Sequence, residues 1–549
     1  MLGDHLGDSQ RVGRRATEVL VPRSPGAVAG FEEIRAVSLP MIIGLVVRAI
    51  PILAAGFPLN DGGLFYAMAE DVRRAGFALP MYSSYNGVGI PFVYPPLAFY
   101  LAAALAQFAG MSMIAILMLV PFVGSVLTIG AVYLLAREIL PSRFEALLAT
   151  YAFAVLPRAF DWMIDGGGLT RSPGYLLAVL AIWQAARFYR TRSRGSALAT
   201  GILAGLTMLT HPEGALFGIV SVVVIFVFVG RNWRSLLASL GMFALAAIVA
   251  APWWAVALLR FGPGPLLSGG QTGLDAHDSF QYVLTWTFTD EPYMAFLAAI
   301  GLLGALYCAS HRRWLLPVWV VAIFVIDPRG GPQYSMVPLA MLVAIGIREV
   351  ILATIQPSTD PHAEPLWPRS VVRDRFGGLV LAAALLLGVV AALKVPITPY
   401  DPLHALSPAN REAMAWVAHR TPVDAQFAVV TGYGWWVDAT SEWFPVLADR
   451  RSVATVQGWE WMGHQAWIQR VARDDALQSC ATSTDACLRS WVGTGAAGLY
   501  VYVPKGPLLG EASTSNDGTI ALRSSLGQAP GVRLVYDGPG ASVYQLTAR

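Results

Sequence analysis

The sequence predicts a polytopic α-helical membrane protein that ends in a soluble α/β domain. Of its 549 residues, 55% are hydrophobic and only 13% are charged, which is more apolar surface than a soluble domain can bury. Long apolar runs alternate with short basic loops over most of the chain, and these runs stop near residue 396. The net charge of +3 gives no indication of nucleic-acid binding, because the basic residues are spread over the short loops.

Residues 1–36 are polar and rich in arginine, and they contain no apolar core of their own. We expect a flexible cytoplasmic tail here, without the apolar segment of a cleavable signal peptide.

About eleven membrane-spanning helices are expected in the region 37–396, although several runs are shorter than the usual ~20 residues. The apolar runs lie at 37–57, 113–136, 144–157, 173–189, 196–210, 215–230, 235–257, 293–310, 314–326, 338–354 and 377–396.

The basic loops indicate the orientation of these helices. If the apolar segment 95–109 does not cross the membrane, every Arg-rich loop falls on the same side as the N-terminal tail, which the positive-inside rule assigns to the cytoplasm. Segment 95–109 is then expected to lie on the outer membrane surface, within a long first external loop, 58–112. The loops concerned are 136–143, 187–194, 231–234, 311–313 and 368–375.

In this orientation most unusual polar residues fall in external loops. Carboxylates gathered at the outer ends of separate helices indicate a functional site on that face. The chain has no Gly-rich phosphate loop, so direct use of a cytoplasmic nucleotide is not expected. The residues are Asp61, Asp71, Asp161, Asp165, His211, Glu213, Asp275 to Asp278, Asp290, Glu291, Asp327 and Arg329.

The region 397–549 is expected to fold as a small α/β domain outside the cytoplasm, because it follows an odd number of spans. Helices are predicted at 407–420, where Ser407 and Pro408 give a good start, and at 437–447 and 464–479. Cys480 and Cys487 are expected to form a local disulfide, as an oxidising compartment permits; two unpaired thiols are the alternative. Strands are predicted at 426–432, 452–458, 499–505, 532–538 and 542–547.

The order of several short patches resembles the GT-C membrane glycosyltransferases, a superfamily that includes protein O-mannosyltransferases, aminoarabinose transferases and oligosaccharyltransferases. One long apolar helix leads to NDGG (60–63) and an amphipathic helix, followed by YPPL (94–97) and a span that ends in YLLARE (133–138). The C-terminal stretches 407–430 and 442–461 also resemble the tails of bacterial members. The resemblance covers roughly residues 37–350 in layout.

This resemblance implies a sugar donor linked to a polyprenyl phosphate or diphosphate, and a glycan, lipid or protein acceptor. It places Asp61 as the group that deprotonates or orients the acceptor hydroxyl, with inversion at the anomeric carbon. It places Arg329, in DPRGGPQY (327–334), on the lipid phosphate, where a guanidinium binds in a bidentate manner. An alternative for Asp61 is a helix N-cap, and an alternative for Arg329 is a side chain that snorkels to the interface.

Four further candidates carry open alternatives. Arg48 lies inside the first span; it is assigned to the donor phosphate, and it either pairs with a carboxylate or snorkels outward. Asp161 and Asp165 are four residues apart and would share one helical face, where they assist Asp61 or hold Mg²⁺ or Mn²⁺ with it, as in oligosaccharyltransferases. Asp71, on the polar face of the 64–74 helix, is expected to be solvated or structural.

The remaining candidates are aromatic or paired groups. His211 and Glu213 end the fifth span and are site or structural residues, and Tyr94, which opens YPPL, joins the same candidate site. Trp435 and Trp436, in GYGWWVDAT, superficially resemble the WWD signature of oligosaccharyltransferases, but a valine separates them from the aspartate. They either stack on sugar or pack the soluble domain onto the membrane part.

The sequence therefore predicts a multi-pass cell-membrane glycosyltransferase that uses a polyprenyl-linked donor. Two alternatives stay open at this stage. One is an oligosaccharyltransferase-like enzyme with a metal and a peptide acceptor. The other is a non-catalytic transporter or flippase of lipid-linked saccharides, although transporters usually carry paired repeats and no internal repeat is visible here.

Overall fold

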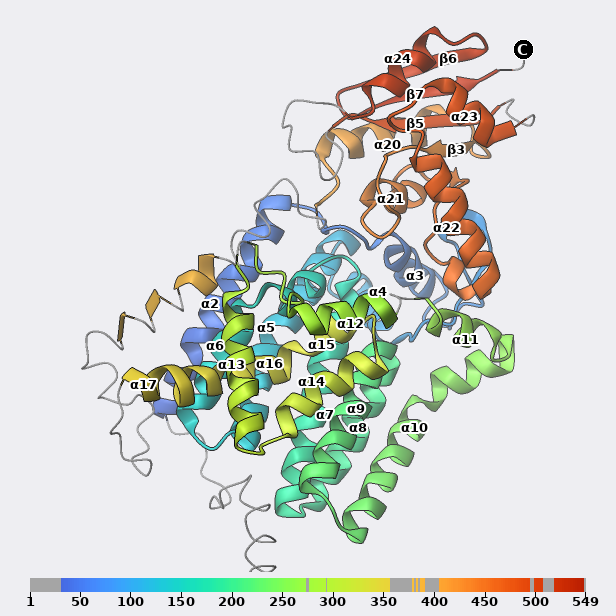
Figure 1. Ribbon diagram of the computed structural model, residues 1–549. Coiled ribbons are helices and arrows are strands. Elements are labelled where there is room, and N and C mark those ends of the chain that lie inside the picture. Colours follow the sequence, from blue (N-terminus) through green and yellow to red (C-terminus); the bar gives the residue numbers. More distant parts are fainter. Residues whose placement is uncertain are drawn as a thin grey trace, which may run out of the picture.

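The computed structural model describes residues 31–272, 276–292, 294–355, parts of 378–390, 404–493, 498–506 and 518–547. Figure 1 shows two parts: a bundle of helices, coloured blue to yellow, and a C-terminal part with a sheet, coloured orange to red, at one end of that bundle.

Each of the first ten expected apolar runs coincides with helix. The first helix starts at Phe31, inside the segment that we assigned to the tail, and residues 1–30 lie outside the described part of the chain. Most of the eleventh run, 377–396, also lies outside it. The helices are α2 (Phe31–Ala55), α5 (Met113–Ile139), α6 (Arg143–Val155), α7 (Gly168–Thr191), α8 (Arg194–Thr210), α9 (Pro212–Val229), α10 (Trp233–Phe261), α13 (Phe296–Ser310), α14 (Leu315–Ile326) and α16 (Met336–Ile345), which runs into the π-helical turn η4 (Gly346–Leu352).

Length and composition identify five of these helical segments as able to cross a membrane in the described part of the chain. They are α2, α5, α9, α10 and the segment Gly331–Leu352; the bent pair of α13 and α14, with an angle of 118° between its helices, makes a sixth if it is taken as one span. The protein is thus a multi-helical membrane protein, while the number eleven stays a prediction.

Local sequence signals fix where several helices begin. Ser112 accepts a hydrogen bond from the Ala115 N–H at the start of α5, and Asn232 does the same for Ser235 at the start of α10. At α6, Ser142 and Glu145 form a reciprocal capping box.

The segment 58–112 folds as a compact layer at one end of the bundle. It contains α3 (Gly63–Arg74), a two-stranded hairpin of β1 (Tyr82–Ser83) and β2 (Ile90–Pro91) and α4 (Leu97–Phe108). With 12 residues, α4 is about 18 Å long, too short to cross a bilayer of ~30 Å. Asp71 is buried, not solvated: it accepts hydrogen bonds from the Ser83 hydroxyl and the Ser84 N–H.

The C-terminal part contains a five-stranded mixed sheet in the order β4-β3-β5-β7-β6. β3 pairs in parallel with β4 and β5, and β7 pairs antiparallel with β5 and β6. The elements are α20 (Pro408–Arg420), β3 (Gln426–Val429), α21 (Ala439–Leu447), β4 (Arg451–Ser452), α22 (His464–Gln478), α23 (Asp485–Val492), β5 (Tyr500–Pro504), α24 (Ile520–Gln528), β6 (Val532–Asp537) and β7 (Ala541–Leu546).

These elements match most of the expectation for this region. Ser407 caps α20 by accepting from the Asn410 N–H, as its sequence indicates. The strand expected at 452–458 is wrong beyond Ser452: the chain turns there, Gly458 has a φ of 89°, and the short 3₁₀ helix η6 (Trp459–Trp461) follows. That φ favours glycine and ends any extended run.

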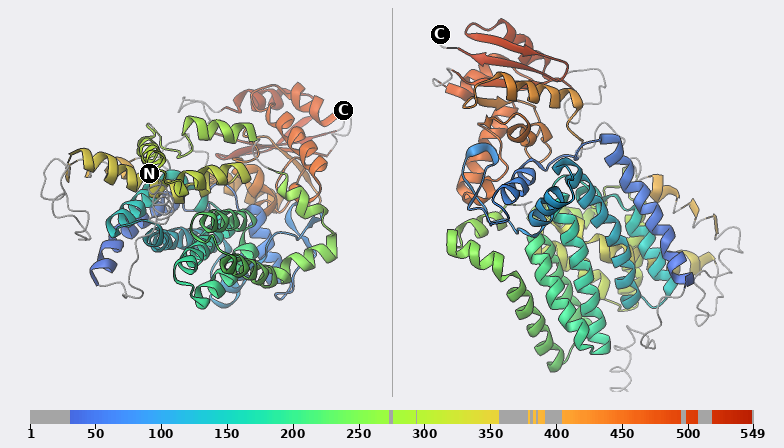
Figure 2. Two further views of the ribbon diagram at one scale, coloured as in Figure 1. Left: turned by 60° about the horizontal axis from the view of Figure 1, so that its bottom comes forward. Right: turned by 180° about the vertical axis from the view of Figure 1, so that it is seen from behind.

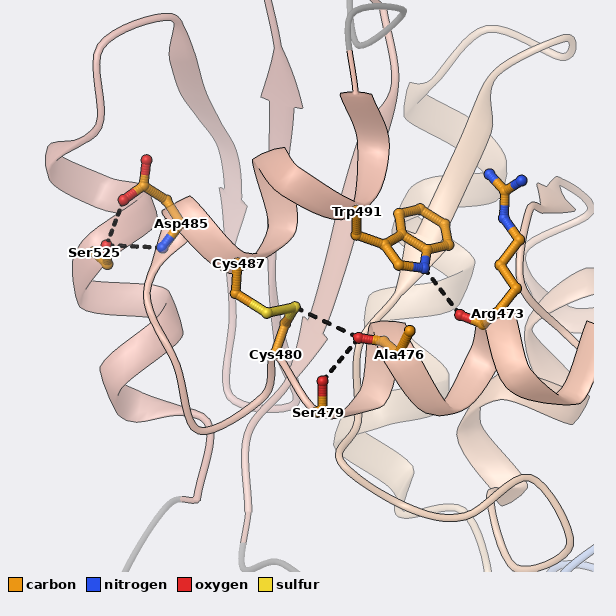
Figure 3. The surroundings of a disulfide bond; sticks show 8 residues. All are labelled: Arg473, Ala476, Ser479, Cys480, Asp485, Cys487, Trp491 and Ser525. Atoms are coloured by element: carbon orange, nitrogen blue, oxygen red, sulfur yellow. Dashed lines mark hydrogen bonds between the residues drawn. A yellow bond between two sulfur atoms is a disulfide. The ribbon is translucent and has the colours of Figure 1, made fainter.

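Cys480 and Cys487 form a disulfide between the end of α22 and the start of α23, with a Cα–Cα distance of 5.5 Å. Figure 3 shows its surroundings, where Trp491 of α23 donates to the Arg473 carbonyl oxygen of α22, 2.9 Å away. The third cysteine, Cys308, is a buried free thiol.

The C-terminal part rests directly on the 58–112 segment. One hydrophobic core contains side chains from both, including Phe92, Phe99, Trp443 and Phe444, and it is separate from the core of the bundle. In Figures 1 and 2 the orange helices lie beside the blue α3, in agreement with the contact between α21 and α3. The first loop is therefore held between the helical bundle and the C-terminal part.

Candidate functional site

Asp61 does not cap the helix that follows it. The N-cap of α3 is Gly62, with a φ of 123° and no side-chain cap. The Asp61 carboxylate points instead to the start of α7: Oδ1 accepts from the Gly167 N–H at 2.5 Å and Oδ2 from Arg171 Nη2 at 2.6 Å. About 23% of its side chain is exposed.

Asp165 joins the same cluster. It is fully buried, Oδ1 accepts from the Gly168 N–H at 2.7 Å, and Oδ2 lies 3.1 Å from Arg171 Nη1. Burial raises the pKa of Asp165 well above its usual value, an effect that the Arg171 charge opposes and the Asp61 charge reinforces. Asp61 and Asp165 are thus brought together through one guanidinium.

Two glycine-containing loops make this approach possible. The Gly166 N–H donates to the Leu59 carbonyl oxygen at 2.9 Å, which ties DGGG (165–168) to NDGG (60–63). A Cβ on Gly166 would overlap the Asp61 carbonyl oxygen, and one on Gly167 would overlap the Arg171 guanidinium. Gly166 and Gly167 are required because the start of α7 lies directly against the loop that carries Asp61, with no room for a side chain.

A second group of polar residues extends the cluster. Arg329 Nε lies 3.1 Å from Glu213 Oε1, and His211 Nε2 lies 3.5 Å from Glu213 Oε2. His211 Nδ1 is 2.8 Å from the Tyr94 hydroxyl, which is 3.0 Å from the Thr170 hydroxyl. The Thr170 hydroxyl also lies 3.4 Å from the carbonyl oxygen of Gly167, whose N–H donates to Asp61. Polar contacts thus lead from Asp61, through the Gly167 backbone, to the group that holds Arg329.

Two neutral groups complete this network. With the Tyr94 hydroxyl as donor to His211 Nδ1, the neutral imidazole carries its proton on Nε2, which faces Glu213 at 3.5 Å. Burial lowers the pKa of His211, which keeps the ring neutral. Burial also raises the pKa of Tyr94, which keeps its hydroxyl protonated as a donor.

The loop 327–331 presents Arg329. Asp327 Oδ1 accepts from the Gly330 N–H at 2.9 Å and closes the turn. Burial raises the pKa of Asp327 to about 7. Arg329 Nη1 donates to the Thr272 carbonyl and hydroxyl oxygens at 3.2 and 3.3 Å, and half of its side chain is exposed. These contacts leave Nη2 without a hydrogen-bond partner among the described residues.

Asp161 and Arg48 lie elsewhere in the site region. Residues 157–163 form two short 3₁₀ helices, η2 (Pro157–Ala159) and η3 (Asp161–Met163), and Asp165 follows them outside any helix. The expected shared helical face is therefore wrong, because the following glycines interrupt the helix. Asp161 is an electrostatic neighbour of Arg48.

Arg48 is completely buried between three helices of the bundle. Its Nε donates to the Ser125 hydroxyl at 2.8 Å, and its Nη1 donates to the Gly44 and Ala154 carbonyl oxygens at 3.1 and 2.8 Å. Its guanidinium lies 4.7 Å from the centre of the Phe160 ring. These contacts tie α2, α5 and α6 together, and they do not join Arg48 to Arg329.

The C-terminal part supplies residues to the Asp61 loop. Glu442 Oε1 accepts from the Gly62 N–H at 2.9 Å and from the Leu64 N–H at 3.4 Å, so it caps α3 from outside. The Trp443 indole donates to the Asn60 carbonyl oxygen at 3.2 Å. Sequence reasoning did not select Glu442, because its partner is almost four hundred residues away.

The tryptophan pair serves two surfaces. The Trp436 carbonyl oxygen accepts from the Asn60 amide at 3.2 Å, and its ring, 53% exposed, lies 6.2 Å from that of Trp162. The Trp435 ring is 6.2 Å from the Trp467 ring, within the C-terminal part. Trp436 thus packs the two parts together and also keeps an open aromatic face, while Trp435 packs within the C-terminal part.

Arg171 is the other residue that the sequence reasoning missed. It stands within the stretch DGGGLTR, and an arginine in the first turn of a helix just after an aspartate and three glycines is the signal that was available. Among the described residues, no group of three or more His, Cys, Asp or Glu side chains is arranged to hold a metal ion.

Comparisons with known proteins agree with this architecture. The family model of dolichyl-phosphate-mannose-protein mannosyltransferases matches residues 93–255. No curated protein sequence matches the chain.

Solved structures match over most of the chain. The ArnT protein of Cupriavidus metallidurans, bound to undecaprenyl phosphate, is 15% identical, with a TM-score of 0.55 over 95% of this chain and 99% of that one. An oligosaccharyltransferase of Archaeoglobus fulgidus, in complex with Zn and sulfate, is 16% identical, with a TM-score of 0.55 over 85% and 68% of the two chains. The AglB oligosaccharyltransferase of the same organism, with an inhibitory peptide and a dolichol-phosphate, is 15% identical, with a TM-score of 0.53 over 86% and 69%.

These proteins are GT-C glycosyltransferases, and the resemblance expected from the sequence is confirmed at the level of the fold. The chain is a membrane protein with a GT-C-like fold.

Glu442 gives the site a measurable pH dependence. Burial, and then the nearby Asp61 charge, raise its pKa to about 8, against 4.5 for an ordinary glutamate. Between these values the folded protein keeps a proton that the unfolded chain releases, so the free energy of unfolding falls as the pH rises. We expect Glu442→Gln, which stays neutral and keeps the accepting oxygen, to weaken the fall in melting temperature between about pH 5.5 and about pH 8.5.

Thermal melts of the two purified proteins in detergent test this expectation. Asp438 and Asp474, whose pKa values burial raises to about 6 and about 7, are present in both proteins, so only the difference between the slopes reports on Glu442. Equal slopes would show that Glu442 does not hold the additional proton.

Proposed function

We propose that this protein is an inverting glycosyltransferase that moves a sugar from a polyprenyl-phosphate or polyprenyl-diphosphate donor to an acceptor hydroxyl at the outer face of the cell membrane. The observation that carries the proposal is the polar network that connects a partly exposed carboxylate, Asp61, to a half-exposed arginine, Arg329. Base and phosphate ligand are the two groups that such a reaction needs.

The solved relatives support the type of donor. The ArnT structure contains undecaprenyl phosphate and the AglB structure contains a dolichol-phosphate. A donor of this type is already held in the bilayer by its chain, so the protein needs no nucleotide sugar.

In the proposed reaction, an acceptor oxygen attacks the anomeric carbon while Asp61 takes the hydroxyl proton. The bond between the anomeric carbon and the phosphate oxygen breaks, and its electron pair stays on the phosphate. Arg329 balances that negative charge through Nη2, since Glu213 and Thr272 already hold its other nitrogens. Glu213, His211 and Tyr94 act as positioning residues, because they fix the guanidinium of Arg329. A single displacement of this kind inverts the anomeric configuration.

The orientation of the proposed enzyme follows from its basic loops. We place the site and the C-terminal part outside the cytoplasm, and α4 on the outer membrane surface. The natural cysteines suit a labelling test: Cys308 is buried and the other two form a disulfide.

We expect Val423→Cys, at a position that is 81% exposed, to react with a membrane-impermeant maleimide in intact cells. The matched variant Arg231→Cys, on an exposed loop at the other end of the bundle, should react only after the cells are opened. Labelling of residue 231 but not of residue 423 in intact cells would reverse the proposed orientation.

Asp61→Asn should lower turnover by ~10²–10⁴-fold, the usual contribution of a positioned base, and leave donor binding nearly unchanged. The amide oxygen of asparagine keeps the bond from the Gly167 N–H, but it cannot take up the acceptor proton. Transfer from synthetic polyprenyl-phosphate sugars, measured with purified protein, checks this. Asp424→Asn, at an exposed position on the C-terminal part, is the matched control. Full activity of Asp61→Asn would direct the search for the base to Asp165 and Glu213.

Arg329→Lys should raise the KM for the donor by about tenfold, because the charge stays but the planar fork that matches phosphate is lost. The KM for the acceptor should not change. Steady-state kinetics with each substrate varied in turn separates the two effects. Arg420→Lys, on the exposed end of α20, is the control. An unchanged KM for the donor would show that Arg329 does not bind the donor phosphate.

A further inference from the structure

Arg171 lies between the two carboxylates of the site. Its Nη2 is 2.6 Å from Asp61 Oδ2 and its Nη1 is 3.1 Å from Asp165 Oδ2. The Trp162 carbonyl oxygen accepts from Nη1 at 3.1 Å, and the guanidinium lies 5.9 Å from the centre of the Trp162 ring. The guanidinium is thus fixed on three sides.

The second oxygen of each carboxylate is also bound. Asp61 Oδ1 and Asp165 Oδ1 accept from consecutive N–H groups, those of Gly167 and Gly168, at the start of α7. Helix N-termini favour negative charge. Each carboxylate therefore has one oxygen on the helix N-terminus and one on Arg171, which fixes both the position and the plane of Asp61.

A divalent metal does not fit this arrangement. Mg²⁺ requires about six oxygen ligands at ~2.0–2.1 Å. Both Asp61 oxygens and Asp165 Oδ1 already accept hydrogen bonds, and Asp165 Oδ2 lies 3.1 Å from the fixed Arg171 cation. A divalent cation here would also lie next to the positively charged guanidinium of Arg171, and the two would repel each other. Asp161, the third expected ligand, lies near Arg48 instead. The expected metal set of Asp61, Asp161 and Asp165 is therefore not formed.

We infer that Arg171 is a positioning residue that orients Asp61, and that the protein performs its reaction without a bound divalent cation. This inference rests on the proposed function. When Asp61 accepts a proton, Asp165 still lies 3.1 Å from Arg171 and holds the guanidinium in place.

The first test needs no substrate. Mn²⁺ is added to the purified protein and the free ion is followed by electron paramagnetic resonance. We expect no stoichiometric binding, and a melting temperature that is the same with EDTA as with Mg²⁺. One tightly bound Mn²⁺ that is lost in Asp61→Asn would overturn the inference, whether or not glycosyl transfer has been found.

The second test uses the pH dependence of turnover. Removal of a positive charge a few ångström away raises the pKa of a carboxylate by about 1–3 units. The acid limb of the kcat/KM profile should therefore move to higher pH by that amount in Arg171→Ala and by less in Arg171→Lys. Turnover of Arg171→Ala should also fall by roughly 10²-fold, because Asp61 loses its orientation.

The matched control is Arg158→Ala. Arg158 pairs with Asp290 at 3.0 Å and lies near the same Trp162 ring, but its ion pairs within the described part of the chain include neither Asp61 nor Asp165. The Arg158→Ala variant should leave the pH profile of kcat/KM unchanged. If Arg171→Ala does not fold, Arg171→Lys carries the test. An unshifted acid limb in a folded Arg171 variant, or activity that requires added Mg²⁺, would overturn the inference. Absence of transfer under all conditions, together with no Mn²⁺ binding, would instead overturn the proposed function.

Discussion

The site depends on the direct contact of two glycine-containing backbones. The hydrogen bond from the Gly166 N–H to the Leu59 carbonyl oxygen brings the start of α7 against the loop that carries Asp61. Any side chain at Gly166 or Gly167 would separate these segments, because a Cβ there overlaps backbone or guanidinium atoms. Since Asp61 and Arg171 come from these two segments, the ion pair at the centre of the site exists only while this contact holds.

Buried charge is the second constraint on the molecule. A charged group in an apolar bundle is costly unless polar partners surround it. Arg48 meets this condition with a serine hydroxyl and two carbonyl oxygens and thereby joins three helices. Arg171 meets it with two carboxylates. The two buried arginines thus have different roles. Arg48 holds helices together, and Arg171 lies beside Asp61, the proposed base.

The C-terminal part is a structural component of the site as well as a neighbouring domain. Glu442 caps α3, Trp443 holds the Asn60 carbonyl oxygen, and the Trp461 ring lies 5.6 Å from that of Tyr94. Each of the two halves of the polar network therefore contacts this part. Its buried carboxyl group at Glu442 sits beside Asp61 and couples the stability of the interface to pH.

The sequence alone determined the membrane class, the positions of the helices and most of the C-terminal elements, because apolar runs, caps and alternation are local signals. It also selected Asp61 and Arg329, which stand at helix ends with an evident charge. It did not find Arg171 or Glu442, and it placed Asp161 with Asp165 on a helix that does not form. Only the tertiary structure decided these points, since the partner of a buried charge is chosen by which backbones pack together, and no local pattern records that choice.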